Sequence, residues 1–78
     1  MSVCTNLTES KLAEGMTKIQ NDCKEVSIGS YPYFKRGKLG VNIVLRSIDK
    51  ELLLKQTELI ETFINEIGGK VLETQLPN

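Results

Sequence analysis

The interval from Leu39 to Leu45 restricts the fold of this chain more than any other. Leu39, Val41, Ile43 and Leu45 occupy every second position, which places all four on one side of an extended strand. Val44 adds an apolar side chain on the other side, as in strands with neighbours along both edges. We therefore expect 39–45 to form an interior strand that packs against a helix.

That helix is expected at 50–67. Asp49 can cap its first turn, and Gly68 can adopt the left-handed conformation that ends many helices. Glu51 and Lys55, four positions apart, belong to its outer side. The inner side is apolar except for one glutamine, and its residues recur at helical spacing. They are Leu52, Leu53, Gln56, Leu59, Ile60, Phe63, Ile64 and Ile67.

A second helix is expected at about 9–23. Asn6 or Thr8 can cap it, and Asn6 with Glu9 has the form of a capping box. Gly15 inside this helix costs about 1 kcal/mol relative to alanine; it either lets a neighbouring strand come close or is simply tolerated. The inner residues are spaced by four, three and four positions: Leu12, Met16, Ile19 and Cys23.

Three shorter strands complete the pattern. The stretch 31–38 contains Pro32, which has no amide hydrogen for a sheet ladder, so this stretch is expected to be a loop or a strand end that runs into one. Pro77 should stop the last strand. The three strands are expected at 3–5, 25–30 and 70–76.

The order of elements predicts the fold. Strand, helix, strand, strand, helix and strand follow one another in a single α+β domain of residues 1–78. A right-handed crossover in each strand–helix–strand unit favours the ferredoxin-like βαββαβ sandwich. This fold has a four-stranded antiparallel sheet, the first and third strands inside, and two helices on one face. Val44 would lie with Asn42 and Arg46 on the other face, which a second copy or a missing domain would cover.

Composition argues against several classes of partner. The chain has ten Lys and Arg, ten Asp and Glu, and no histidine, so its formal net charge is zero. No long-range field draws such a chain to nucleic acid or to an anionic membrane, and a lack of charge repulsion favours self-association. With no long apolar run and no signal-like segment, we expect a cytoplasmic protein.

The two cysteines do not predict a metal site. Cys4 and Cys23 lie 19 positions apart, which is not a metal-ligand spacing, and no histidine can complete a site. We expect two buried, reduced thiols. A disulfide is the alternative, although a reducing cytosol opposes it.

No pattern in the sequence predicts catalysis. A nucleophile needs a positioned base, and no such pair stands out. Gly37–Gly40 is too short for a phosphate-binding loop and leads into a strand. RNA-binding domains of this fold stack bases on aromatic residues of the central strands, and the expected central strands have none. We therefore expect no catalytic residue, no bound metal or other cofactor, and no nucleic-acid partner.

One cluster remains as a candidate contact site. Residues 30–36 hold three of the four aromatic residues and two adjacent cations. Either the aromatic rings pack on the end of the sheet and the cations stay in water, or the cluster contacts a partner domain or the phosphates of a nucleotide. In the second case the arginine guanidinium would bind the anion through hydrogen bonds, and the tyrosine ring would offer a flat contact surface. The candidate contact residues are Ser30, Tyr31, Pro32, Tyr33, Lys35 and Arg36.

Three stretches resemble a known family. Thr8–Ala13 resembles a G-x-x-E-S-x-L-A helix entry, Val26–Pro32 resembles V-x-I-x-S-Y/H-P, and Gly68–Val71 resembles the end of the same unit. Together, over about residues 3–72, they resemble the C-terminal half of the molybdopterin-binding-like domain. That domain occurs in the competence/damage-inducible protein A (CinA) family and is fused to FAD synthase in many eukaryotes, where Gly-Ser-Tyr-Pro stands as at Gly29–Pro32.

The resemblance implies that the chain works within a larger protein. In the family, a nucleotide- or pterin-binding half comes first and carries the pocket, so that half or a second copy is the implied partner. Implied activities of the parent are pyrophosphate cleavage of FAD or ADP-ribose and adenylyl transfer to FMN, with Mg²⁺ or another divalent cation. No position here matches the residues that perform them. Asn6, Leu7 and Thr8 replace frequent glycines of the family, which would alter the strand-to-helix turn.

Three hypotheses of function follow. The first is a non-catalytic accessory or interaction subdomain of a nucleotide-processing protein of the FAD synthase or CinA type. The second is a free-standing domain that binds a small regulatory molecule, or a homodimerisation module. The third is a hydrolase that uses Tyr31, Lys35 and Arg36. The first accounts best for the motifs and for the lack of catalytic groups.

Overall fold

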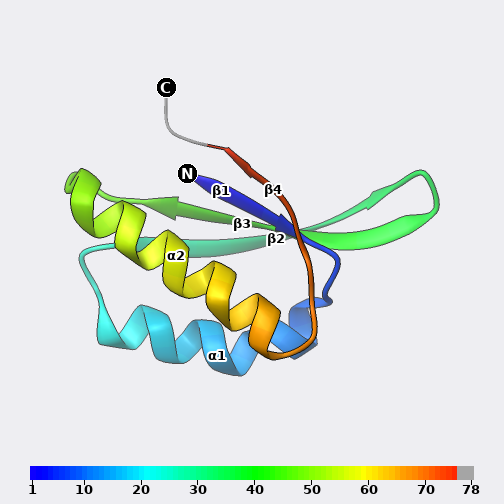
Figure 1. Ribbon diagram of the computed structural model, residues 1–78, viewed down its shortest axis with the longest axis horizontal. Helices are drawn as coiled ribbons and strands as arrows, with labels where there is room; N and C mark the ends of the chain where they lie inside the picture. Colours follow the sequence, from blue (N-terminus) through cyan, green and yellow to red (C-terminus); the bar gives the residue numbers. More distant parts are fainter. Residues whose placement is uncertain (76–78) are drawn as a thin grey trace.

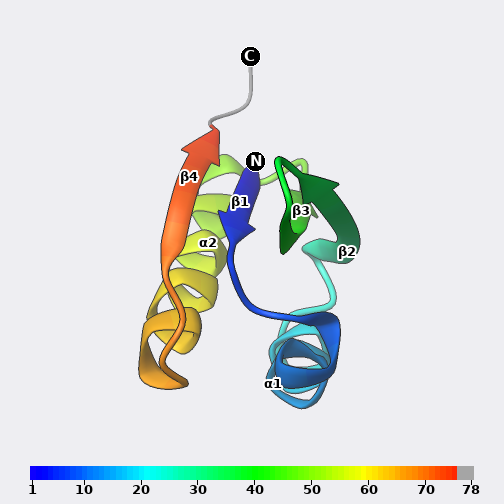
Figure 2. The ribbon, with the colours of Figure 1, turned by 90° about the vertical axis from the view of Figure 1, so that its right-hand side faces the viewer.

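The computed structural model describes residues 1–75 and has the predicted α+β fold. The four strands form one antiparallel sheet in the order β2-β3-β1-β4, so the first and third strands lie inside, as predicted. Both helices cover the same face of the sheet (Figures 1 and 2). The elements are β1 (Ser2–Thr5), α1 (Glu9–Asp22), β2 (Ser27–Lys35), β3 (Lys38–Arg46), α2 (Lys50–Glu66) and β4 (Val71–Gln75).

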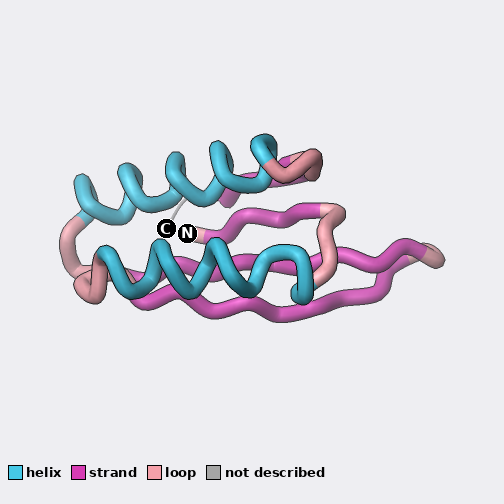
Figure 3. The backbone as a smooth tube through the Cα atoms, turned by 90° about the horizontal axis from the view of Figure 1, so that it is seen from below, coloured by secondary structure: helices cyan, strands magenta, loops and turns pink. Residues whose placement is uncertain are grey.

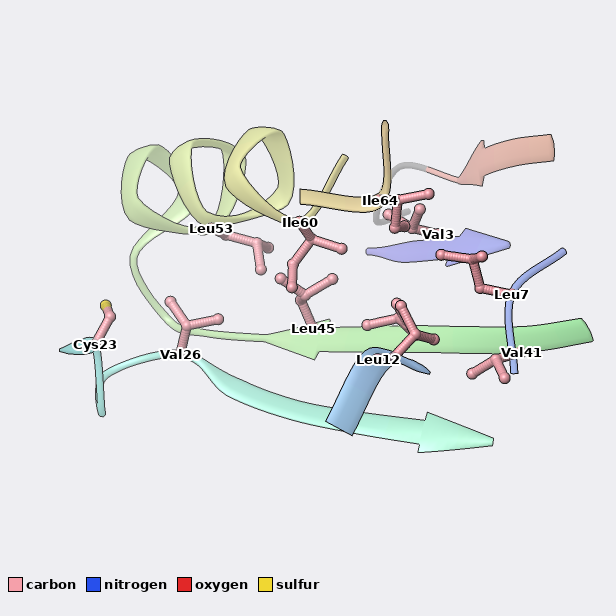
Figure 4. Close-up of a cluster of buried hydrophobic side chains, with 11 residues drawn as sticks. Val3, Leu7, Leu12, Cys23, Val26, Val41, Leu45, Leu53, Ile60 and Ile64 are labelled. Atoms are coloured by element: carbon pink, nitrogen blue, oxygen red, sulfur yellow. The ribbon is translucent and has the colours of Figure 1, made fainter. Parts of the chain in front are cut away.

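The core fills the space between the sheet and the two helices, which lie side by side beneath it (Figure 3). The predicted interior strand is confirmed, because Val41, Ile43 and Leu45 of β3 are buried. Burial of one such side chain stabilises the fold by about 1.5–3 kcal/mol. Their main partners come from β1, α1 and α2 and are Val3, Leu12, Leu53, Ile60 and Ile64 (Figure 4).

Leu39 does not join this core, and its predicted burial is wrong. The side chain is 67% exposed, although it continues the alternation of its strand. The reason is the length of the neighbouring strand: β1 pairs with β3 only from Val41 to Val44. Alternation sets the side on which a residue lies, but burial also needs a covering element.

The ends of α2 match the prediction, but part of its inner side does not. The carboxylate of Asp49 accepts a hydrogen bond of 3.1 Å from the Leu52 amide, and Gly68 has φ 86°. Leu59 and Ile67 remain 46% and 40% exposed, so they lie at the margin of the core.

The start of α1 differs from the predicted capping box. Thr8 occupies the N-cap position, and its side chain makes no capping hydrogen bond. Asn6 instead accepts a hydrogen bond of 2.9 Å from the amide of Lys70 and so ties the β1–α1 loop to the start of β4. Gly15 does permit a close approach, but of a helix rather than a strand: a methyl group there would clash with the ring of Phe63 on α2.

Strand β2 runs through Pro32 to Lys35 and ends in the turn at 36–37, so the second alternative for 31–38, a strand end that runs into a loop, is confirmed and the first, a loop throughout, is wrong. At the outer edge, the amide of Ile28 donates to Gln20 Oε1 at 2.8 Å, and Gln20 Nε2 donates to the carbonyl of Val26 at 2.7 Å. Backbone groups of every second residue point the same way, so the nitrogen of Pro32 faces this outer edge. The proline therefore removes no bond to β3.

The last strand agrees with the prediction as far as Gln75, while Leu76 and the predicted stop at Pro77 lie outside the described residues. Its pairing with β1 is irregular between Cys4 and Thr5. Both cysteines are free; Cys23 is buried as predicted, whereas Cys4 is only half-buried. Within residues 1–75, neither helix combines the length and the apolar character needed to cross a membrane.

Candidate functional site

The β2–β3 hairpin carries all six candidate contact residues and projects beyond the rest of the sheet (Figure 1). Its turn is Arg36–Gly37, with φ values of 51° and 77°. Positive φ at both central residues is typical of a type I′ turn, whose twist matches that of paired strands. The turn fixes Lys35 opposite Lys38 and with it the register of the whole hairpin.

The register separates the candidate residues onto two faces of the sheet. Ser30 and Pro32 lie opposite Ile43 and Val41, hence on the side of the helices. The other strand residues, Tyr31, Tyr33 and Lys35, alternate with them and lie on the uncovered face, while Arg36 lies in the turn. The structure therefore brings together Tyr31, Tyr33 and Lys35, but not the whole predicted set.

Tyr33 lies against the uncovered face because β3 offers a glycine there. A methyl group on Gly40 would be 2.5 Å from the phenol atoms Cζ and Oη of Tyr33 and 2.8 Å from the carbonyl oxygen of Thr5. Lys35 reaches back so that its Nζ is 5.9 Å from the centre of the Tyr33 ring, within the range of a cation–π contact. The ring thus joins the hairpin to the interior strands.

Burial raises the pKa of Tyr33 above its ordinary value of 10.0, and the neighbouring Cys4 adds to this effect. A raised pKa means that the fold favours the neutral phenol. Its contribution to stability is then complete below pH 10 and disappears as the pH rises through the pKa of the folded state. Cys4 itself is held near Asn42, with a distance of 3.8 Å between Sγ and Oδ1.

This shift gives a direct prediction for a protein with a single tyrosine. In Tyr31→Phe, Tyr33 is the only phenol, since the chain has two tyrosines. Its phenolate absorbance should titrate with a midpoint above 10.0 in the folded protein and return toward that value in denaturant. Adding Cys4→Ala should lower the midpoint. Equal midpoints in the folded and the denatured protein would show that Tyr33 is solvated.

A shallow polar groove of about 140 Å³ adjoins the Tyr33 ring on the uncovered face. Its side chains offer an ammonium, a thiol, a hydroxyl, amides and a carboxylate, which can bind a polar group. They do not form a nucleophile with a base. Among residues 1–75, no three acidic, cysteine or histidine side chains are placed to hold a metal ion. The lining residues are Ser2, Cys4, Lys35, Asn42, Glu73 and Gln75.

On the helix side, Ser30 belongs to a different surface. Its hydroxyl donates to Glu9 Oε1 at 3.3 Å, and both residues line a groove of about 350 Å³ between α1 and β2. Sequence reasoning placed Asn42 on the uncovered face through the alternation of β3 but missed Cys4 and Glu73. The alternation within the short β1 would have placed Cys4 there, whereas Glu73 depends on pairing between chain ends that no local pattern reveals.

Comparison with known families gives a match over most of the chain. The family described as "FAD synthase, middle domain" matches residues 1–68, from the start of the chain through α2 to the glycine that ends it. Comparisons with curated proteins and with solved structures gave no match. The match covers more than half of the 78 residues, and the chain therefore belongs to the FAD synthase middle-domain family.

Proposed function

We propose that this chain is a non-catalytic accessory subdomain of a nucleotide-processing protein of the FAD synthase type. In this proposal, the hairpin and the uncovered face of the sheet contact the nucleotide-binding half of the parent protein. The observation that carries it is an apolar pair at the projecting end of the hairpin. Phe34 and Leu39 lie opposite each other and are 66% and 67% exposed. The kinship with the competence/damage-inducible protein A family is part of the same proposal.

The arrangement supports contact better than catalysis. Tyr31 and Lys35 lie on one face while Arg36 lies in the turn, so the three residues of the hydrolase hypothesis do not converge on one point. General acid–base chemistry needs a donor or base within hydrogen-bond reach of a reacting group. Clusters of exposed aromatic and arginine side chains, by contrast, are typical of the centres of protein interfaces.

The charges around the apolar pair indicate the chemistry of the partner surface. Phe34 and Leu39 lie on the helix side of the hairpin, Lys35 and Lys38 lie next to them along the strands but on the other side, and Arg36 lies in the turn. A complementary surface would combine an apolar depression with acidic residues around it, because opposite charges steer association and fix orientation. Tyr31, 57% exposed, lies on the uncovered face, so a partner that contacts both sides of the hairpin would also meet this side chain.

The test is to measure binding of this chain to the separately expressed nucleotide-binding half of its parent by calorimetry. The double variant Phe34→Ser/Leu39→Ser should weaken binding at least about tenfold, as expected for the loss of central apolar anchors. The matched control is Leu54→Ser, which alters a side chain 49% exposed on α2.

Three results would contradict the proposal. One is unchanged affinity in the hairpin variant. Another is an equal loss of affinity in the Leu54→Ser control. The third is appreciable cleavage of FAD by this chain alone with Mg²⁺ or Mn²⁺. If the chain instead forms a dimer that the hairpin variant disrupts, sedimentation will show it, and the contact surface would then belong to a second copy.

A further inference from the structure

Two tyrosine rings lie on the uncovered face of the sheet, each next to a glycine. A methyl group on Gly29 would be 3.3 Å from the hydroxyl oxygen of Tyr31. Gly40 stands directly opposite Tyr33 and makes room for its phenol. Because neither glycine has a side chain, each ring leans along the sheet, and Tyr31 remains 57% exposed. We call these two residues the tyrosine platform.

The platform has the form that single-stranded nucleic acids use for base stacking. Tyr31 and Tyr33 are two residues apart in β2, hence on the same side and about 6–7 Å apart along the strand. Proteins that bind single strands stack successive bases on aromatic side chains of a sheet. The expectation of no nucleic-acid partner rested on the interior strands, which carry no aromatic residue. Here the edge strand β2 supplies both rings.

The β2–β3 hairpin is also the basic part of the chain. Residues 26–48 contain four Lys and Arg and no Asp or Glu, so all ten acidic residues lie outside this interval. Lys35 and Lys38 lie directly opposite each other on the uncovered face, and Arg36 lies in the turn next to them. Like charges directly opposite each other destabilise a strand pair. A bound anion would relieve this repulsion.

The positive charge lies next to the platform. The Nζ atom of Lys35 is 5.9 Å from the centre of the Tyr33 ring. Asn42, directly opposite Tyr31, adds an amide that can donate to and accept from the edge of a base. Glu73 also belongs to the uncovered face, but it lies on β4, which β1 separates from β3. The aromatic and basic side chains therefore share the half of the face formed by β2 and β3.

We propose that this half of the uncovered face binds a short segment of single-stranded nucleic acid. Two bases stack on Tyr31 and Tyr33. The phosphates that join these nucleotides to their neighbours bind to Lys35, Arg36 and Lys38. Because base planes and phosphates are recognised, the preference among base sequences is small.

This inference goes beyond the proposed function and can be tested apart from it. The observation that carries the partner contact is the pair Phe34 and Leu39, which lies on the helix side of the hairpin, whereas the platform lies on the uncovered face. A partner domain seated on the uncovered face would exclude the nucleic acid. Binding is therefore measured with the chain of 78 residues alone.

The test is a titration of fluorescein-labelled oligouridylate and oligodeoxythymidylate, each of about ten nucleotides, followed by fluorescence anisotropy at low salt. At least one of them should bind. In proton NMR spectra of the complex, the ring signals of Tyr31 and Tyr33 should shift. The ring of Phe34 is an internal control, because it is 66% exposed but lies on the other side of the same hairpin, and its signals should stay in place.

Variants separate stacking from charge. Tyr31→Ala should lower the affinity about five- to a hundredfold, the equivalent of one stacked base, while Tyr31→Phe keeps the ring and should bind nearly as the wild type does. Lys35→Gln/Lys38→Gln should reduce the slope of log affinity against log salt by about 1.4, as for two phosphate contacts. Lys50→Gln/Lys55→Gln makes the same charge change on α2 and should leave this slope unchanged.

Four results would each overturn the proposal. Neither oligonucleotide binds and shifts the tyrosine signals, or Tyr31→Ala binds as tightly as the wild type. Uridine monophosphate binds as tightly as the oligonucleotides, which would indicate a site for a single nucleotide. The fourth is an equal loss of salt dependence in the α2 variant, which would place the phosphates elsewhere. The charge variants keep the proposal testable if Tyr31→Ala does not fold.

Discussion

Replacing Ile43 by alanine is expected to lower the free energy of unfolding by about 2–5 kcal/mol. Ile43 is fully buried at the centre of β3, where it lies opposite Val3 of β1 and on the side that the helices cover. A domain of 78 residues has a total stability of roughly 4–12 kcal/mol. The variant should therefore unfold at much lower urea concentration, measured by circular dichroism.

Leu39→Ala is the matched control for this experiment. Leu39 belongs to the same strand and the same alternation, yet it is 67% exposed. Its replacement should change the stability by no more than about 0.5 kcal/mol, as for surface positions in general. Similar losses in the two variants would mean that the end of the hairpin is covered in solution or that Ile43 is not central.

Replacing Gly40 by alanine is expected to lower the free energy of unfolding by about 1–3 kcal/mol, the cost of overpacking a dense site. The added methyl group would meet both the Tyr33 ring at 2.5 Å and the carbonyl oxygen of Thr5 at 2.8 Å. The ring can rotate away, but the carbonyl belongs to the backbone of a paired strand. Thermal unfolding of the variant should show a lower midpoint.

The double variant Gly40→Ala/Tyr33→Ala separates the two contacts. Removing the ring eliminates one clash and leaves the one with Thr5. The added methyl group should therefore lower the free energy of unfolding by less when the phenol is absent than when it is present, but should still lower it. Comparison with Tyr33→Ala alone gives this difference. No loss of stability in the single Gly40 variant would show that β1 and β3 separate easily at this point.

Much of the fold follows from periodicity and from the residues that end helices. The alternation at 41–45 and the helical spacing after Asp49 are local patterns, and the right-handed crossover then leaves few topologies. The predictions that failed concern residues whose surroundings are set by elements distant in the sequence. The exposure of Leu39 reflects the length of β1, and the role of Asn6 reflects an amide 64 positions away.

The candidate site was predictable in its residues but not in its geometry. The aromatic and basic cluster at 30–36 was found from composition, whereas its division between two faces required the register of the hairpin. Pro32 led to the prediction of a loop or a strand end, because the sequence does not show that the proline nitrogen faces the open edge of β2 and not β3. Gln56 was recognised as part of the helix side, but its near-complete burial, with 6% exposed, is visible only in three dimensions.

The edge of β2 bears on whether this sheet can pair with another chain. A chain with no net charge lacks the electrostatic repulsion that keeps many proteins apart, and an open strand edge is a template for aggregation. Here Gln20 occupies the first backbone groups of that edge, and Pro32 withholds a donor further along it. Pairing of this edge with another strand is thus opposed by two side chains, Gln20 and Pro32, where other proteins use charge.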